Sequence, residues 1–83
     1  MTAVVVPFPP AKRQDLVRSI ARRALSLSPE AGEKHIVRSI NLQHRTLCSK
    51  GVSLRDSHIE MNALEAAIRT VMWEAVMQPR ETR

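Results

Sequence analysis

His44 and Cys48 are the residues of this sequence whose types and spacing best suit chemistry at a site. They stand four positions apart, so on a helix their side chains share one face. An imidazole and a thiolate placed in this way can share a zinc ion. A zinc site needs more ligands, but His35 points to the other side of the same predicted helix and His58 lies off the main apolar face of the next. The pattern favours a partly buried histidine beside a small thiol.

Catalysis has little support in the sequence. A cysteine nucleophile needs an oriented base and a group that stabilises an oxyanion, and we find no glycine-rich phosphate loop and no pair of carboxylates that would share a cleft. Glu30 and Glu33 fall at a predicted helix start, where the helix dipole favours acidic side chains. Glu60, Glu65 and Glu74 are expected to be solvated. We therefore predict no catalytic, metal-binding or cofactor-binding residue and no enzymatic activity.

The composition predicts one small helical domain. The chain has 83 residues, 43% of them hydrophobic, which is too many for a disordered protein. Only 2% are aromatic and two are glycine, whereas β-sandwiches and barrels depend on aromatic and β-branched residues and on glycine-containing hairpins. A core of this size gives thin stability by itself.

Charge and cysteine content bear on partners and compartment. The net charge is +5 and the sequence pI is about 10.7, which attracts anionic partners. One cysteine, Cys48, excludes an internal disulfide and suits a reducing cytoplasm. The apolar start AVVVPFPP is broken by prolines and has no basic residue before it, so it resembles neither a signal peptide nor a membrane span. We expect a cytoplasmic protein with no membrane partner.

Three helices are expected between an arm and a tail. Residues 1–10 read as an extended arm because prolines exclude a helix until the last of them, Pro10, which could sit in the first turn that follows. Residues 79–83 read as a frayed tail. In between, 11–78 read as a single helical domain, with helices predicted over about 11–27, 29–50 and 54–78. Ser28 and Ser53 suit N-caps, and Gly51 suits a left-handed helix end.

Each of the first two helices has one apolar face at helical spacing. On the first it comprises Leu16, Val17, Ile20, Ala24 and Leu27. On the second it comprises Ile36, Val37, Ile40, Leu47 and Cys48, with His44 in the same sector.

The third helix differs because it is apolar on two opposite sides. Its inner seam is Met61, Leu64, Ile68, Val71 and Ala75. Its outer seam is Ile59, Ala63, Ala66, Thr70, Trp73 and Met77. Both seams step by three and four residues as in a heptad repeat. Small residues allow a close backbone approach, and tryptophan is a favoured interface anchor.

The outer seam has two interpretations. It could be a protein–protein surface, most simply that of a homodimer, or of a complex with another protein. Alternatively, the chain itself could cover it, either through the valine-rich arm or because the first two helices straddle the third. We favour the homodimer, and with it a small interaction or regulatory protein, because a short chain gains much by sharing a core.

The first helix is strongly basic. Its cations are Lys12, Arg13, Arg18, Arg22 and Arg23, against Asp15 alone. They could contact the phosphates of a nucleic acid, which gives the alternative function of a nucleic-acid-binding accessory protein. They could equally form a solvated face. The third helix is acidic, so it would be a poor recognition helix in a helix-turn-helix.

The pattern as a whole resembles a family of short alphaproteobacterial proteins known only as a domain of unknown function. The segments that carry the resemblance are VVPFPPAKRQDLVRSIARR, SPEAGEKHIVRSI and LEAAIRTVMWEAV. Within them, the features shared with the family are Pro7, Phe8 and Pro9; Arg13, Arg18 and Arg22; Pro29, Glu30, Glu33, Lys34 and His35; and Trp73. The resemblance covers nearly the whole chain and implies no activity.

Overall fold

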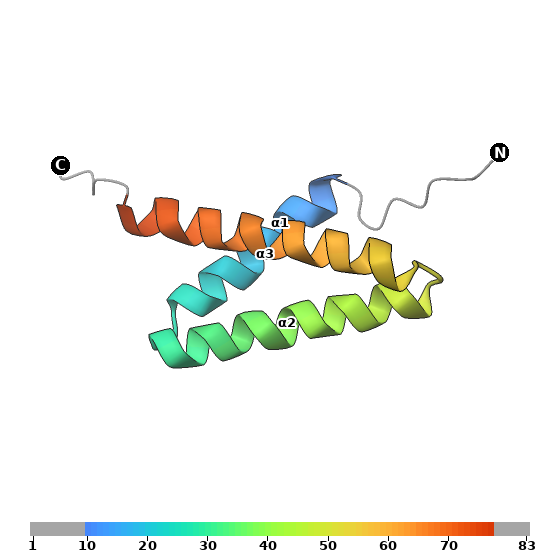
Figure 1. The fold of residues 1–83 in the computed structure, drawn as a ribbon. Coiled ribbons are helices and arrows are strands. Elements are labelled where there is room, and N and C mark those ends of the chain that lie inside the picture. Colours follow the sequence, from blue (N-terminus) through green and yellow to red (C-terminus); the bar gives the residue numbers. More distant parts are fainter. Residues whose placement is uncertain (1–9, 78–83) are drawn as a thin grey trace.

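A computed structural model describes residues 10–77, which form three α-helices and no strand. The helices are α1 (Pro10–Leu25), α2 (Pro29–Ser49) and α3 (Leu54–Met77), and each packs against the other two. α2 and α3 run beside each other, while α1 crosses them obliquely (Figure 1). This confirms the predicted all-α three-helix bundle, in which α3 is the longest helix with 24 residues. The predicted arm, except Pro10, and the predicted tail lie outside the described residues.

Local signals set most helix ends, as predicted. The Ser28 hydroxyl accepts a hydrogen bond from the Ala31 N–H at 3.2 Å, and Pro29 occupies the first position of α2. After α2, Gly51 adopts φ 96°, the left-handed conformation that glycine reaches without strain. Ser53 then caps α3 by accepting from the Asp56 N–H at 3.0 Å.

α1 ends two residues earlier than the predicted boundary at position 27. The Ser26 N–H bonds to the carbonyls of Arg22 and Arg23 at 3.2 and 3.1 Å, and the Ser26 hydroxyl donates to the Arg23 carbonyl at 2.7 Å. Leu27 therefore lies in the connection to α2, where it is half-buried. The chain must turn here because the cap of α2 already begins at Ser28.

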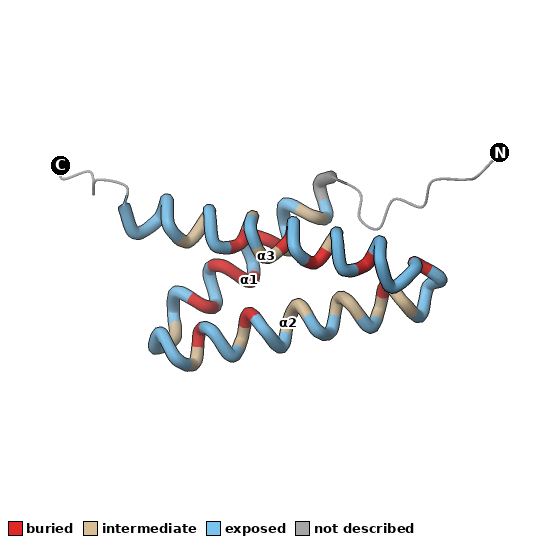
Figure 2. Tube along the Cα trace, in the orientation of Figure 1, coloured by how far each residue is buried: buried red, intermediate tan, exposed pale blue. Residues whose placement is uncertain are grey.

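The core lies where the three helices meet (Figure 2). Its buried hydrophobic members are Val17, Ile20, Ala21, Ala24, Ile36, Leu47, Val52, Met61, Leu64 and Ile68. Of the other residues expected on the apolar faces, Val37 on α2 and Ala75 on α3 are exposed. The rest are half-buried: Leu16, Leu27, Ile40, Cys48 and Val71. Val37 sits on the edge of its face, and Ala75 lies in the last turns of α3, where no residue from 73 to 77 is buried.

α1 and α2 come into close backbone contact at Gly32. This buried glycine lies near the start of α2, and a Cβ atom at its position would be 2.7 Å from the carbonyl oxygen of Ala24. Real Cβ atoms do not come so close to a backbone atom. The missing side chain therefore allows the two helices to cross at this distance.

Candidate interaction surface

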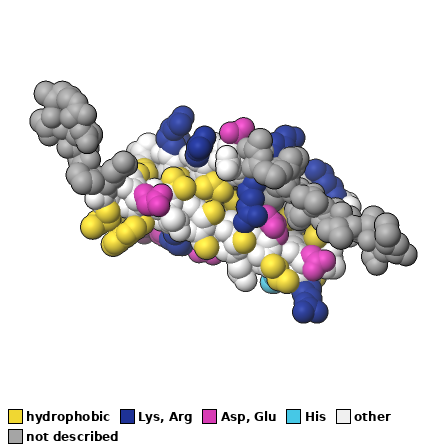
Figure 3. All heavy atoms as spheres, turned by 90° about the horizontal axis from the view of Figure 1, so that it is seen from above, with side chains coloured by type: hydrophobic (Ala, Val, Ile, Leu, Met, Phe, Trp, Pro, Cys, Tyr) yellow, Lys and Arg dark blue, Asp and Glu magenta, His cyan; other side chains and the backbone are white. Residues whose placement is uncertain are grey.

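The outer seam of α3 is exposed along its whole length. All six of its residues are exposed: Ile59, Ala63, Ala66, Thr70, Trp73 and Met77. Hydrophobic side chains accordingly follow α3 across the molecule and gather near its C-terminal end (Figure 3). α1 and α2 both pack on the inner seam, so they do not straddle α3, and that interpretation of the second apolar side is wrong. The alternative in which the arm covers the seam concerns residues outside the described range.

The last turns of α3 are exposed on every side. Trp73, Val76 and Met77 have exposed fractions of 65%, 66% and 56%, and Ala75 between them is exposed as well. The inner seam ends at Val71, which is half-buried. A helix end whose exposed side chains are mostly apolar is typical of a segment that packs against something else.

The edge of the outer seam nearer α2 is marked by a charge cluster. Arg69 donates two hydrogen bonds to the carboxylate of Glu33 on α2, at 2.8 and 2.9 Å, and a third to Glu65, one turn earlier, at 2.9 Å. The bond from Arg69 lowers the pKa of Glu33. The bonds to Glu33 and then Glu65 raise the already high pKa of Arg69. The cluster clamps α2 to α3 but remains substantially exposed, so its effect on stability is screened by water.

The edge nearer α1 carries acidic groups. Glu60 lies 3.4 Å from Arg13 of α1 in an ion pair, and Glu74 lies two turns beyond the last buried residue of α3, exposed to water. The prediction that Glu60 is solvated is therefore wrong, because its side chain is only 16% exposed. The side chains of Glu33 and Glu65 are 53% and 43% exposed, and they form ion pairs in addition. All three carboxylates join ion pairs, and two of these pairs tie separate helices together.

The cations predicted to contact phosphate fall into two groups. Arg13 is directed to Glu60 and is partly buried. Lys12, Arg18, Arg22 and Arg23 are exposed, and none of the four forms an ion pair within residues 10–77. Of the five predicted cations, these four have no ion-pair partner among the described residues.

His44 lies in a small polar cluster rather than in a metal site. Its Nδ1 is 2.7 Å from the hydroxyl of Ser57, which is fully buried, and its Nε2 is 4.0 Å from the Sγ of Cys48. The ring of His58 meets the His44 ring edge to face, with 4.9 Å between centroids. The part of the chain that the structure describes holds no group of three or more metal-ligating side chains. Because Ser57 has no access to solvent, it is poorly placed to attack a substrate.

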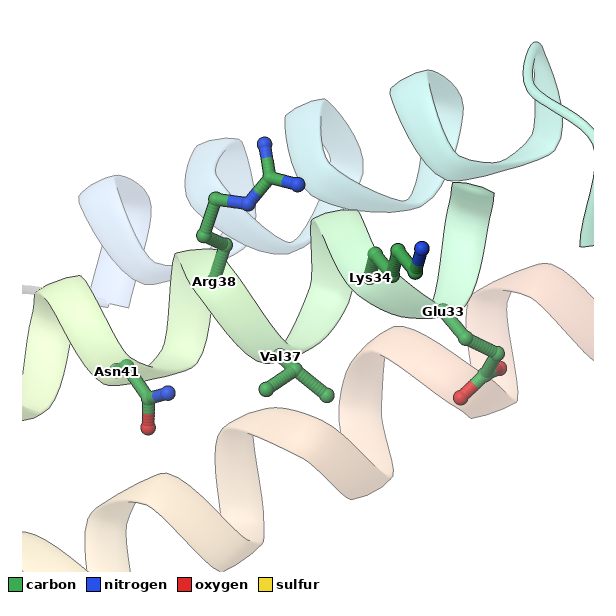
Figure 4. A pocket seen from close by; sticks show the side chains of 5 residues that line it. All are labelled: Glu33, Lys34, Val37, Arg38 and Asn41. Carbon is green, nitrogen blue, oxygen red and sulfur yellow. The ribbon is translucent and has the colours of Figure 1, made fainter. Parts of the chain in front are cut away.

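A shallow, open depression of about 350 Å³ lies on the surface of α2. Its lining comprises Glu33, Lys34, Val37, Arg38 and Asn41, all from α2 itself (Figure 4). Glu33, Val37 and Asn41 point toward α3, whereas Arg38 points to the opposite side of α2 (Figure 4). Because a single helix supplies every group, the depression does not enclose a ligand as small-molecule sites do.

Three features of these surfaces were not predicted from the sequence. They are the clamp between Glu33 and Arg69, the contact of His44 with Ser57 and His58, and the close approach at Gly32. Only the last had a local signal, a glycine in the first turns of a predicted helix, where it costs stability unless packing requires it. The other two join residues of different helices, so no local pattern in the sequence contains them.

Comparison with known proteins places the chain in a family. The model of the Family of unknown function (DUF6074) matches residues 1–83, and the chain belongs to this family. None of the curated proteins matches the chain, and none of the solved structures does. Within the described helices, none is long and apolar enough to cross a membrane.

Proposed function

We propose that this member of a family of unknown function is a small non-enzymatic interaction protein that forms a homodimer through the outer seam of α3. The observation that carries the proposal is the exposure of all six seam residues, although the opposite seam of the same helix fills the core. The proposed site of action is the cytoplasm, which suits a chain with one free thiol.

The seam has the size and shape of a helix-pairing surface. From Ile59 to Met77 it extends over about 27 Å at the helical rise of 1.5 Å per residue. Its middle carries the small residues Ala63 and Ala66, which permit close helix approach, while large side chains stand at both ends. The most exposed of its large residues, Trp73, also has the side chain with the most apolar area to bury.

The charges beside the seam fit a second copy of the same chain. With Ala63, Thr70 and Met77 at heptad position a, Arg69 occupies g and Glu74 occupies e. In a parallel pair, position g of one helix lies beside position e of its partner five residues further on. Arg69 of one subunit would therefore meet Glu74 of the partner subunit. Arg69 uses three N–H groups on Glu33 and Glu65, and two of its five remain for this contact.

The opposite orientation is less favourable. In an antiparallel pair, like positions face each other, so the edge carrying Glu60 and Glu74 meets the same edge of the partner. Carboxylates would then lie close together, which costs free energy when both are ionised. Glu60 is already paired with Arg13, so the repulsion is reduced but not removed. We therefore propose a parallel dimer.

The burial of Trp73 gives the scale of the interaction. A tryptophan side chain buries about 150–250 Å² in a protein contact, and 65% of this residue is exposed in the single chain. Burial of the remainder would contribute about 3 kcal/mol per copy at ~25 cal/mol/Å². Association costs roughly 4–15 kcal/mol, so the tryptophan pair alone is a large part of what a stable dimer requires.

The proposal is tested by light scattering behind a sizing column over a range of concentrations. A dimer has a mass of about 19 kDa, twice the 9.4 kDa of the chain. Trp73→Glu should return the mass to that of one chain and leave the helix content nearly unchanged, because the side chain lies outside the core. Leu42→Glu is the matched control, since Leu42 is an exposed hydrophobic residue of α2, and this variant should remain dimeric.

Two results would refute the proposal. One is a wild-type mass of 9.4 kDa at every concentration. The other is a Trp73→Glu variant that stays dimeric, which would place the interface elsewhere. Loss of helix content in the same variant would instead show that Trp73 is part of the core.

A further inference from the structure

The charges of the molecule are divided between its helices. α1 and α2 together carry eight Lys and Arg residues against three Asp and Glu, whereas α3 carries two against four. The ion pairs connect α3 to the other two helices through Arg13 and Arg69. The remaining seven cations of α1 and α2 are exposed and form no ion pair with any described residue: Lys12, Arg18, Arg22, Arg23, Lys34, Arg38 and Arg45.

On α1, two of these cations point directly away from the core. Arg18 and Arg22 stand two residues before and two residues after Ile20, which is buried. A separation of two residues turns a helix by about 200°, so both arginines lie opposite Ile20. They are also four residues apart and thus neighbours on the helix surface.

α2 repeats the arrangement. Lys34 and Arg38 flank the buried Ile36 at the same spacing, and Arg45 stands two residues before the buried Leu47. All three therefore project from the outer side of α2. Together with Arg18 and Arg22 they form two stripes, one on the outer side of each of two neighbouring helices, which we call the basic face. Gly32 brings the two helices into contact beside Ala24, so the stripe on α1 and the stripe on α2 belong to packed neighbours.

We infer that the basic face binds the phosphate backbone of a nucleic acid without reading its base sequence. Arginine is the main residue in both stripes, and its guanidinium group matches phosphate geometry with two parallel hydrogen bonds. Cations four residues apart are spaced by about 6 Å along each helix axis, so each stripe presents a row of charges to a polyanion. No aromatic side chain lies in either stripe, although a helix that lies on a membrane normally has one as an anchor.

This site is independent of the proposed dimer. The basic face belongs to α1 and α2, whereas the outer seam belongs to α3 and faces away from both. A parallel dimer would present two basic faces, and a single chain would still present one. The sequence predicted a nucleic-acid surface on the first helix alone. The proposed face differs from it because Arg13 is paired with Glu60 and α2 supplies three of the five cations.

The test is a titration of fluorescently labelled 20-base-pair DNA with the full chain, followed by anisotropy. Two duplexes of unrelated sequence are compared between 50 and 200 mM salt. Each phosphate contact contributes about −0.9 to the slope of log K against log salt. Five contacts predict a slope near −4.5, or a loss of affinity on the order of 10²–10³-fold over this range. Both duplexes should bind equally.

Arg38→Gln should weaken binding to both duplexes and reduce the steepness of the slope by about 0.9. Arg55→Gln is the matched control because Arg55 is an exposed arginine of α3 and its replacement removes the same charge. The control should retain the wild-type slope. Helix content and mass in solution are measured on the same samples, so the failure of the dimer is seen separately from the failure of DNA binding.

Three outcomes would overturn the inference. The first is no binding to either duplex at 50 mM salt. The second is an equal loss in Arg38→Gln and Arg55→Gln, which would show a response to net charge alone. The third is displacement of the DNA by poly-glutamate at an equal concentration of charge, which would show that the face recognises acidic chains in general.

Discussion

Replacement of Gly32 by alanine tests the close contact between α1 and α2 at this position. In an unobstructed helix, Gly→Ala stabilises by about 0.8–1.0 kcal/mol because it restricts the unfolded chain. Here the new Cβ would lie 2.7 Å from the carbonyl oxygen of Ala24, whereas ordinary contacts begin at 3.4 Å. The clashing atom belongs to the backbone, so a side-chain rotation cannot relieve the overlap.

The size of the effect follows from the required movement. α1 must retreat by roughly 0.7 Å, and a gap of that size removes about a quarter to a half of the dispersion energy of the separated atoms. Overpacking of this kind costs about 1–3 kcal/mol. After subtraction of the gain in helix propensity, we expect Gly32→Ala to lose up to about 2 kcal/mol, and in no case to gain the ~1 kcal/mol of an unobstructed helix position. The corresponding fall in Tm is about 4–8 °C per kcal/mol for a domain of this size.

The assay is urea unfolding followed by circular dichroism. All variants are compared at one protein concentration, because association makes apparent stability depend on concentration. Asn41→Ala is the control, since Asn41 is an exposed residue of α2 whose replacement reports the propensity term alone. If Gly32→Ala were as stabilising as this control, α1 would not approach α2 as closely as described, and the reasoning would fail.

Three further predictions concern the clamp, the polar cluster and the outer seam. The bond from Arg69 lowers the pKa of Glu33 from its ordinary value of 4.5. The pair therefore contributes stability at pH values above 4.5, and this contribution is lost as the pH falls through the lowered pKa. The difference in unfolding free energy between wild type and Glu33→Gln, measured in urea, should shrink with acid, and a constant difference would contradict the prediction. Ser57→Ala removes the buried partner of a histidine and should cost about 1–3 kcal/mol in the same assay; no loss would show that the bond is not formed. In a Cys48→Ser background, Ile59→Cys should form a disulfide with its own copy if the dimer is parallel, since an antiparallel pair would separate the two positions by about 27 Å along the helix axis. Absence of the cross-link in a confirmed dimer would exclude the parallel orientation.

Much of the fold was predictable because its signals are local. Ser28 and Ser53 cap their helices, and Gly51 supplies the left-handed turn, through bonds and dihedral angles within a few residues. The apolar period placed Ile36 and Leu64 in the core correctly. The prediction that α3 has a second apolar side also needed no tertiary information, because a helical period defines both sides.

The predictions that failed depended on where the neighbouring helices end and cross. Val37 and Ala75 have the correct spacing for a core, but each needs a neighbour to cover it, and none of the described residues does so. A period indicates which side of a helix is apolar and says nothing about how far along its length a neighbour reaches. The exposure of the last turns of α3 is therefore a property of the packing.

The amino-acid sequence by itself determined the three helices, most of their ends and the two apolar sides of α3, because bonds and periods within a helix involve only near neighbours in the chain. Tertiary structure alone decided that Glu33 meets Arg69 and that Glu60 occupies Arg13. These contacts depend on the distance and crossing of separate helices. That geometry is set by packing at points such as Gly32, where the absence of a side chain determines how close two helices can come.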